Sequence, residues 1–213
     1  MRKKTIMPDR ILSEVIKSAA QNGLFYVSTA KVAASLSISE GTIFNNYKTK
    51  QDLLTACFES IDREMDAVLS KVHFQGFSIK RNITAMLDAY MDYWISHPDN
   101  AAFYSEFRHS AYYTQEIVDR QNDSFSFFIK LIQKNKQVFN INIDLFWTFA
   151  IETSLNFAVR IANGTLPGDQ KSREQMYSLL FYGLSAAFKK DSKFQPLDSE
   201  DLSDNDESSS DEI

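Results

Sequence analysis

The stretch SISEGTIFNNYKTKQDLL, Ser37 to Leu54, decides the fold class of this 213-residue chain. Its apolar residues follow helical spacing, yet it carries a glycine at Gly41 and two adjacent asparagines at Asn45 and Asn46. Glycine and asparagine are poor helix formers, so local stability does not explain their presence in a helix. We therefore expect a short helix here whose outer face serves a contact rather than stability.

Two helices are expected before this one. The first runs from Pro8 and Asp9, which form a start signal, to a stop at Gly23, with apolar residues at three- and four-residue spacing between them. The second is capped by Ser28 or Thr29 and is too short to be stable alone, so it needs neighbours. We therefore expect short helices packed against one another.

The start of the third helix has two candidate caps. Ser37 stands at capping-box spacing from Glu40, and Ser39 can cap equally well. In either case two short helices are joined by a tight turn and preceded by a supporting helix, which is the plan of a helix-turn-helix. The second element of that plan lies in the major groove of DNA.

A major-groove position explains the poor helix formers. Glycine permits close approach of the backbone, asparagine can bond adenine through N6 and N7, and serine or threonine can bond bases or phosphates. Lys50 stands near the N-terminus of the next helix, where backbone N–H groups and the helix dipole already favour a phosphate. The candidate DNA contacts are Thr29, Ser39, Glu40, Gly41, Thr42, Asn45, Asn46, Tyr47, Lys48 and Lys50.

The charge distribution favours a nucleic-acid partner for the front of the chain only. The formal net charge is −5, yet residues 1–50 hold eight Lys or Arg against three Asp or Glu, and residues 191–213 hold one against nine. We expect the acidic tail, 191–213, to be disordered because almost nothing in it can be buried. It is either a solvated end or an intramolecular mimic of DNA phosphates that competes for the basic front.

The rest of the chain is also predicted to be helical, since no strand-like alternation occurs. Thr49 and Asp52 form a capping-box pair that opens a long helix, and Pro98 ends one helix or begins the next. The expected helices after Thr49 cover residues 50–72, 79–97, 101–107, 114–136, 144–164 and 176–187.

Composition excludes several classes of protein. The hydrophobic share of 44% is enough for a core, and the single cysteine, Cys57, rules out an intrachain disulfide and favours a reducing compartment. The sequence has neither an apolar run of membrane-span length nor a signal peptide, so we expect a soluble, cytoplasmic protein. No catalytic constellation, phosphate-cradling glycine loop or helical histidine pair occurs, so we expect no enzyme, no metal site and no cofactor.

Residues Gly23 to Leu54 resemble the DNA-binding region of the TetR family of bacterial repressors, above all in STAKVAASLSISEGTIFNNYKTKQDLL. The resemblance is specific because it is an ordered set of separate features. In chain order these features fall on Thr29, on Val32 with Ala33, on Ile38 through Thr42, on Phe44 with Tyr47, and on Thr49, Lys50 and Leu53.

Two positions depart from the family pattern. Ser37 stands where the family usually has the turn glycine, and the aromatic pair reads Phe44 then Tyr47 rather than the commoner reverse order. We expect the serine to strain the turn slightly. We also expect Tyr47, whose ring carries a hydroxyl, to donate to a backbone phosphate, which Phe44 cannot do.

The resemblance implies a helical body, a homodimer formed through the last two helices, and a ligand cavity between the middle helices whose occupancy releases operator DNA. The aromatic residues of the body collectively suggest a cavity for an aromatic or apolar effector, although core packing is the simpler explanation for any one of them. The candidate ligand contacts are Tyr90, Trp94, Phe103, Phe107, Phe125, Phe128, Trp147 and Ile151.

These observations predict an all-α protein in three parts. A helix-turn-helix DNA-binding domain covers 1–50, a larger helical ligand-binding and dimerisation domain covers 51–190, and the acidic tail covers 191–213. The expected function is a homodimeric, ligand-responsive transcriptional repressor that binds double-stranded operator DNA. The alternative is a helical interaction or nucleoid-associated module of the same fold without operator specificity.

Overall fold

Helices make up all the regular secondary structure of the residues that the computed structural model describes, which are 8–73, 79–124, 145 and 147–185. The prediction of an all-α fold is therefore confirmed for this part of the chain. In order, the elements are α1 (Pro8–Asn22), the 3-10 turn η1 (Leu24–Tyr26), α2 (Thr29–Ser35), α3 (Glu40–Asn46), α4 (Lys50–Leu69), α5 (Ile79–Ser96), α6 (Pro98–Arg108), α7 (Gln115–Ser124), the π-helix η2 (Trp147–Glu152), α10 (Thr153–Ala162) and α11 (Gln170–Ser185).

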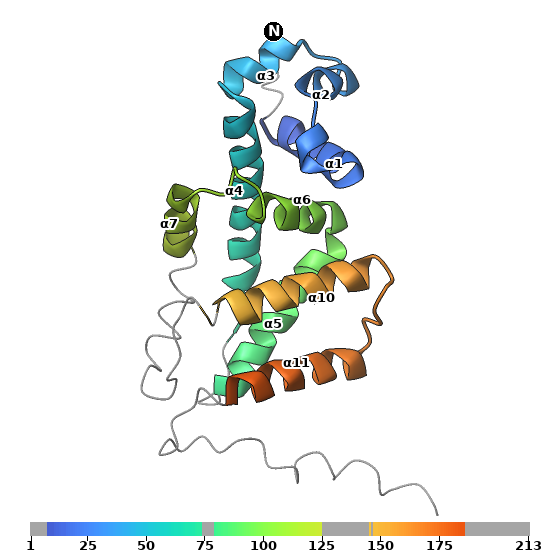
Figure 1. The fold of residues 1–213 in the computed structure, drawn as a ribbon, viewed down its shortest axis with the longest axis vertical. Helices are drawn as coiled ribbons and strands as arrows, with labels where there is room; N and C mark the ends of the chain where they lie inside the picture. The colour runs from blue at the N-terminus through green and yellow to red at the C-terminus, as the bar shows by residue number, and fades with distance from the viewer. Residues whose placement is uncertain (1–7, 74–78, 125–144, 146, 186–213) are drawn as a thin grey trace, which may run out of the picture.

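The helix α4 forms the long axis of the molecule (Figure 1). The short helices α1, α2 and α3 gather at its N-terminal end, and α5, α10 and α11 lie toward its other end. Between them lies α6, which packs on both α1 and α4 and also contacts α10. The helix α6 therefore connects the end that carries α3 with the body that carries α10.

One hydrophobic core extends through these elements. The apolar face predicted for the first helix, from Ile11 to Ala19, is buried as expected. The stripe predicted for the fifth helix is buried as well, with Trp94 completely inaccessible to solvent. On α4, Phe58 stacks on the rings of Tyr104 and Phe107 at centroid distances of 4.6 and 4.5 Å, which attaches α6 to α4. The core thus fixes where α3 stands relative to the body.

The turn between α2 and α3 is closed by backbone hydrogen bonds at the end of α2. The Ser37 N–H donates to the Ala34 carbonyl at 3.1 Å, and the Ile38 N–H donates to the Ala33 carbonyl at 3.0 Å. This pair of bonds is a Schellman motif, which places Ser37 in the left-handed region with φ of 56°. Glycine adopts that conformation at least cost, so the predicted strain at this serine has a physical basis.

The capping predictions are settled by side-chain hydrogen bonds. Ser28 caps α2 and Ser39 caps α3, each accepting from the backbone N–H three residues on. The predicted capping box of Thr49 and Asp52 is confirmed, with both reciprocal bonds at 3.0 Å. The N-termini of α2, α3 and α4 are therefore each held by their own sequence.

The later helices differ from the prediction at their boundaries. Pro98 begins α6 at its first position, so that helix starts three residues before the predicted 101. The last helix starts at Gln170 because the Asp169 carboxylate accepts from the Ser172 N–H at 2.9 Å, a cap the prediction missed. The apolar segment 144–164 was expected as one helix, but it begins as the π-helix η2 before becoming α10.

Parts of the predictions lie outside the described residues. These are the second half of the expected helix 114–136, the candidate ligand contacts Phe125 and Phe128, and the acidic tail 191–213. Within the ranges that the structure describes, no helix has the length and apolar character needed to cross a membrane.

Candidate nucleic-acid interface

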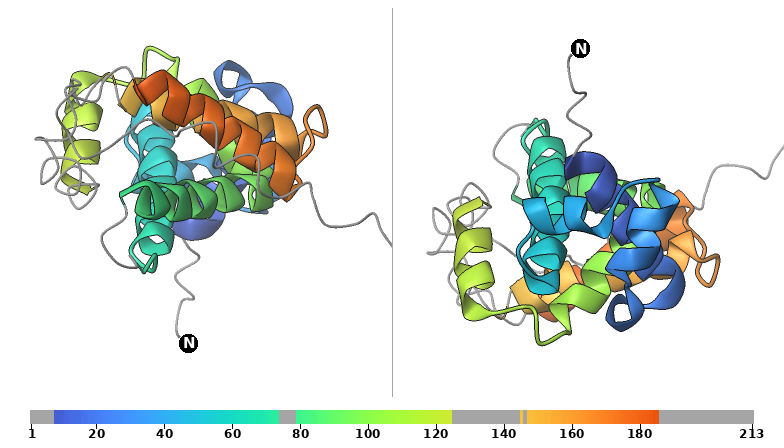
Figure 2. Two further views of the ribbon diagram at one scale, coloured as in Figure 1. Left: turned by 90° about the horizontal axis from the view of Figure 1, so that it is seen from below. Right: turned by 90° about the horizontal axis from the view of Figure 1, so that it is seen from above.

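The helix α3 lies at one end of the molecule, where Figure 2 views it from above together with α2. It is anchored through one face only. Ile43 is 0% exposed, and Tyr47, one turn later on the same face, packs half-buried against the core. Asn45 and Asn46 are exposed on the opposite side. A short helix held in this way presents its polar face to any partner that approaches this end of the molecule.

Two hydroxyl groups and a glycine form the N-terminal turn of α3. The Ser39 hydroxyl accepts from the Thr42 N–H at 3.2 Å and shares a 3.0 Å hydrogen bond with the Thr42 hydroxyl. Gly41 lies between them and is exposed. A methyl group at Gly41 would find the Ser39 Oγ at 3.7 Å, an ordinary contact, so the fold of the isolated protein does not require glycine there.

The two asparagines of α3 differ in how they are held. The Asn46 side-chain amide donates to the Thr42 carbonyl at 2.8 Å, so the helix already uses one of its donors. Within the described part of the chain, no hydrogen bond engages the side chain of Asn45. Asn45 is therefore the more available of the two for a bidentate contact with a base.

The first turns of α2 and α3 are joined by a hydrogen bond. The Thr29 hydroxyl donates to the Glu40 carboxylate at 2.5 Å, and both residues lie at the surface. The bond holds the two helices in a fixed relation and satisfies part of the Glu40 carboxylate. Thr29 and Glu40, both predicted as DNA contacts, are thus brought together by the fold. The Thr29 hydroxyl already donates its hydrogen to Glu40, so it can only accept a hydrogen bond from DNA.

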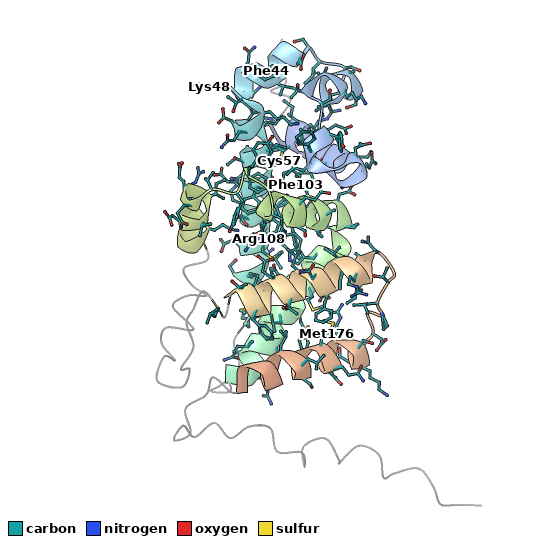
Figure 3. The ribbon with its side chains drawn as sticks, viewed as in Figure 1. Phe44, Lys48, Cys57, Phe103, Arg108 and Met176 are labelled. Carbon is teal, nitrogen blue, oxygen red and sulfur yellow. The ribbon has the colours of Figure 1, made fainter. Side chains whose placement is uncertain are left out.

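The two candidate lysines occupy the opposite end of α3. Lys48 is exposed just beyond the helix and is visible with Phe44 at the end of the molecule in Figure 3. Lys50 is the first residue of α4, and its ammonium donates to the Phe25 carbonyl at 3.0 Å. An ammonium has three donors, so Lys50 can hold η1 and still meet a phosphate at the N-terminus of α4.

The environment of Tyr47 keeps its hydroxyl protonated. Burial raises the pKa of Tyr47, and the Cys57 thiol and the Asp9 carboxylate add to the rise, while Arg63 opposes it. These groups belong to α1 and α4, so the tyrosine contributes to packing α3 onto its supporting helices. Its hydroxyl remains a donor at any physiological pH.

Sequence reasoning missed an exposed aromatic residue on α3. The Phe44 side chain is 43% exposed, whereas its neighbour Ile43 is fully buried. The reason is geometric, because Ile43 and Tyr47 share a face one turn apart while Phe44 is rotated by about 100° from Ile43. An apolar ring beside Asn45 is suited to contact with a thymine methyl group.

The candidate ligand contacts are divided between one cluster and separate positions. Tyr90, Trp94, Phe103 and Phe107 lie in one aromatic core between α5 and α6. Ile151 is half-buried in η2 and packs against the same core. Trp147 opens η2, and the structure describes its backbone only. Three of the four residues in the cluster are completely inaccessible to solvent.

A buried polar network beside this cluster was not predicted. The Asp62 carboxylate of α4 accepts from the Tyr104 hydroxyl at 2.8 Å and from the Gln121 amide at 3.0 Å. The Gln121 carbonyl oxygen in turn accepts from Arg108 at 3.2 Å and from the Tyr113 hydroxyl at 2.6 Å. Burial raises the pKa of Asp62 to about 6, while the bonds from Tyr104 and Gln121 oppose the rise. The network joins α4, α6 and α7.

No group of three or more His, Cys, Asp or Glu side chains in the described ranges is arranged to hold a metal ion. Cys57 is buried, its thiol donates to the Leu12 carbonyl at 3.7 Å, and burial raises its pKa. It therefore contributes to packing between α1 and α4.

Comparison with known proteins places the fold. No protein-family model matches the chain, and no curated protein matches it. Among solved structures, a TetR family transcription regulator from Marinobacter aquaeolei VT8 is similar, with a TM-score of 0.75, 18% identity, and 86% of this chain and 96% of that chain covered. A TetR-family transcriptional regulator from Haemophilus influenzae superposes with a TM-score of 0.67, 20% identity, and coverage of 89% and 100%.

A third similar structure is that of the fatty acid degradation regulator FadR from Bacillus halodurans, with a TM-score of 0.64, 15% identity, and coverage of 82% of this chain and 97% of that chain. The similarity extends over nearly the full length of each of these proteins, so it includes the body as well as the helix-turn-helix end. This chain has the fold of the TetR-family transcription regulators.

Proposed function

We propose that this chain is a DNA-binding transcription regulator of the TetR family, with α3 as its recognition helix. The observation that carries the proposal is the division of α3 into a fully buried anchor at Ile43 and an exposed polar face at Asn45 and Asn46. A helix with this division can enter the major groove while its supporting helices stay packed.

Each candidate contact then has a distinct role. Asn45 reads a base edge, and Phe44 packs on a thymine methyl group. Gly41 allows the backbone of α3 to approach the groove. Lys48 and Lys50 bind phosphates, which fixes the register of the protein on the duplex without reading sequence. The contacts of Thr29 and Glu40 are limited by the hydrogen bond that they make with each other.

We further propose a homodimer formed through α10 and α11. Large apolar side chains are exposed near these helices, with Leu179 of α11 66% exposed and Phe149 of η2 44% exposed. A contiguous exposed apolar patch marks a surface that a partner covers, and we propose that these two side chains belong to such a patch. A dimer would present two copies of α3 to half-sites separated by one helical turn of DNA or a multiple of it.

The proposed regulator is a repressor that a small molecule releases from its operator. Release requires that the effector bind more tightly to one arrangement of the two α3 helices than to the other. The helix α6 is suited to this coupling because it contacts both α1 and α10. A regulator that binds operator DNA in this way would act in the cytoplasm.

A selection from genomic DNA tests the proposal. The purified chain is incubated at physiological salt with fragments of genomic upstream DNA and with random duplex, and the dissociation constants of retained and random fragments are compared. We expect retained fragments to bind about a thousand-fold more tightly, or better. A ratio near one would favour the nucleoid-associated alternative, and a chain that binds no duplex would contradict both.

A further inference from the structure

Four shielded polar atoms in the body have no hydrogen-bond partner. Within the part of the chain that the structure describes, these are the Tyr90 hydroxyl, the Trp94 indole nitrogen Nε1, the Glu152 carboxylate oxygen Oε2 and the Ser154 hydroxyl. Folded proteins leave few buried polar atoms unpaired, because each lost its bonds to water on burial. Four such atoms on helices that contact one another therefore indicate partners that the described part of the chain does not supply.

The unpaired atoms belong to helices that pack against one another. Tyr90 and Trp94 lie one turn apart on α5, with their rings edge to face at 5.6 Å. Glu152 and Ser154 lie where η2 continues into α10, which contacts both α5 and α6 (Figure 1). Burial raises the pKa of Tyr90, Arg108 and the neighbouring Trp94 N–H lower it, and Glu152 adds to the rise. The Tyr90 hydroxyl and the Trp94 N–H therefore lie near each other, although their geometry falls short of a hydrogen bond.

One of the two Glu152 oxygens is already occupied. Arg108 donates to Oε1 through Nε at 2.7 Å and through a terminal nitrogen at 2.5 Å, while Oε2 is shielded from solvent and free. Figure 3 marks Arg108 on α6, beside α10. A shielded carboxylate oxygen is an acceptor that a charged donor satisfies best.

The charges of this region do not balance. Among the described residues of this network, the two carboxylates of Asp62 and Glu152 face one guanidinium, that of Arg108. The Arg108 guanidinium lies over the rings of Tyr104 and Tyr113, at 5.8 and 5.0 Å from their centroids. One further cation would neutralise the region, and the rings of Tyr90 and Trp94 offer it a favourable surface.

We propose that the effector is an organic amine with an aromatic or apolar body, bound as a cation at Glu152 Oε2 with Tyr90 and Trp94 around it. The hydroxyl of Tyr90 and the N–H of Trp94 are donors for an acceptor atom elsewhere on the same molecule. An anionic effector is disfavoured, because it would add a second uncompensated negative charge. Binding of the amine does not depend on the proposed function. Only the statement that amine binding releases DNA rests on it.

The site is connected to the DNA-binding end through α6. Arg108, which shares Glu152 with the amine, lies two residues from Glu106 on this helix, and the Glu106 carboxylate accepts from the Leu24 N–H of η1 at 2.6 Å. An amine at Oε2 shares the charge of the Glu152 carboxylate with Arg108 on Oε1, which weakens the hold of Glu152 on Arg108 and, with it, on α6. Glu106 is therefore a positioning residue between effector and α3, and it does not touch the amine.

The test compares molecules that share a body and differ in charge. The full chain without DNA is titrated calorimetrically at pH 7.5 with 1-naphthylmethylamine, 1-naphthylmethanol and 1-naphthoate, and with benzylamine, benzyl alcohol and benzoate. We expect the amine of at least one set to bind about 10-fold more tightly than its alcohol and carboxylate, the factor that one charge-assisted hydrogen bond supplies. Glu152→Gln should remove this preference.

Matched variants separate the site from the rest of the surface. Glu174→Gln removes an equivalent charge at the exposed surface of α11 and should leave amine affinity unchanged. Tyr90→Leu and Trp94→Leu remove the rings that face the cation and should each weaken amine binding several-fold, and they test the site should Glu152→Gln fail to fold. Glu106→Ala should keep the amine affinity and lose amine-induced release of DNA.

Equal binding of the three members of each set would overturn the proposal, as would unchanged amine preference in Glu152→Gln or failure of all six compounds to bind. Full amine-induced release by Glu106→Ala would overturn the coupling through α6. Because the titrations contain no DNA, these failures are distinct from failure of the DNA-binding function, which the genomic selection measures separately.

Discussion

Replacing Gly41 with alanine should stabilise the protein and weaken its binding to DNA. The new methyl group would lie 3.7 Å from the Ser39 Oγ, an ordinary contact, so the free protein accepts it. Alanine in place of a helical glycine contributes about 0.5 to 1 kcal/mol to the free energy of unfolding. For a chain of this length that gain raises Tm by about 1 to 4 °C.

Other described glycines explain why this position is informative. Gly23 and Gly164 have φ of +91° and +71°, and a methyl group at Gly168 would lie 2.6 Å from the Ile161 Cγ2, so each of these has a structural reason to be glycine. Gly41 has neither a positive φ nor a close neighbour. If α3 approaches the groove at this point, the methyl group should weaken operator binding by about 10-fold or more, equivalent to about 1.4 kcal/mol.

Thermal unfolding and operator titration measure the two effects on the same preparations. Ser13→Ala, on the exposed face of α1, is the matched control, since it also favours helix and should raise stability without changing DNA affinity. Stabilisation by Gly41→Ala with unchanged operator affinity would refute the groove position of α3. A loss of stability would refute the local geometry.

Three further predictions concern other parts of the fold. Ser37→Gly should raise the free energy of unfolding by up to about 1 kcal/mol in denaturant titrations, because φ of 56° favours glycine, whereas Ser37→Val should lower it. Burial raises the pKa of Asp62 to about 6, so the folded state keeps this proton longer than the unfolded state, and stability falls by about 3 kcal/mol as pH rises from about 4 to 6. Asp62→Asn should remove that slope, and an identical pH profile for variant and wild type would contradict the buried-charge explanation. Lys50→Ala should weaken binding to all duplexes alike and reduce the salt slope of binding by about one unit per subunit, and a loss confined to one sequence would contradict a phosphate contact.

Local signals predicted the end of the molecule that carries α3. The capping box at Thr49 and Asp52 involves groups three residues apart, and the turn at Ser37 depends on one backbone conformation, so both were predictable from adjacent residues. The exposure of Phe44 was not, because three aromatic or apolar residues compete for the one buried face of a seven-residue helix. Which of them is buried depends on how α3 packs on α2 and the other helices at this end of the molecule.

The buried network of the body could not be predicted from sequence patterns. Asp62 and Gln121 are 59 residues apart, and the bond between Glu106 and η1 spans 82 residues. Each of these polar residues has the helical surroundings of an ordinary solvated side chain. Their pairing follows from the crossing of α4, α6 and α7, which hydrophobic periodicity alone does not specify. The role of Glu152 could not be predicted for the same reason, because its unpaired oxygen is defined only by the position of Arg108 on another helix.

Dimethyl sulfate footprinting on a selected operator tests most directly whether α3 lies in the major groove. The reagent methylates guanine N7 in the major groove and adenine N3 in the minor groove, so the two grooves report separately. We predict protection of guanine N7 in two patches separated by one helical turn or a multiple of it, weakened in both patches by Asn45→Ala at equal protein concentration, with adenine N3 between the patches still reactive. Protection confined to adenine N3, or an unprotected operator under saturating protein, would contradict the account.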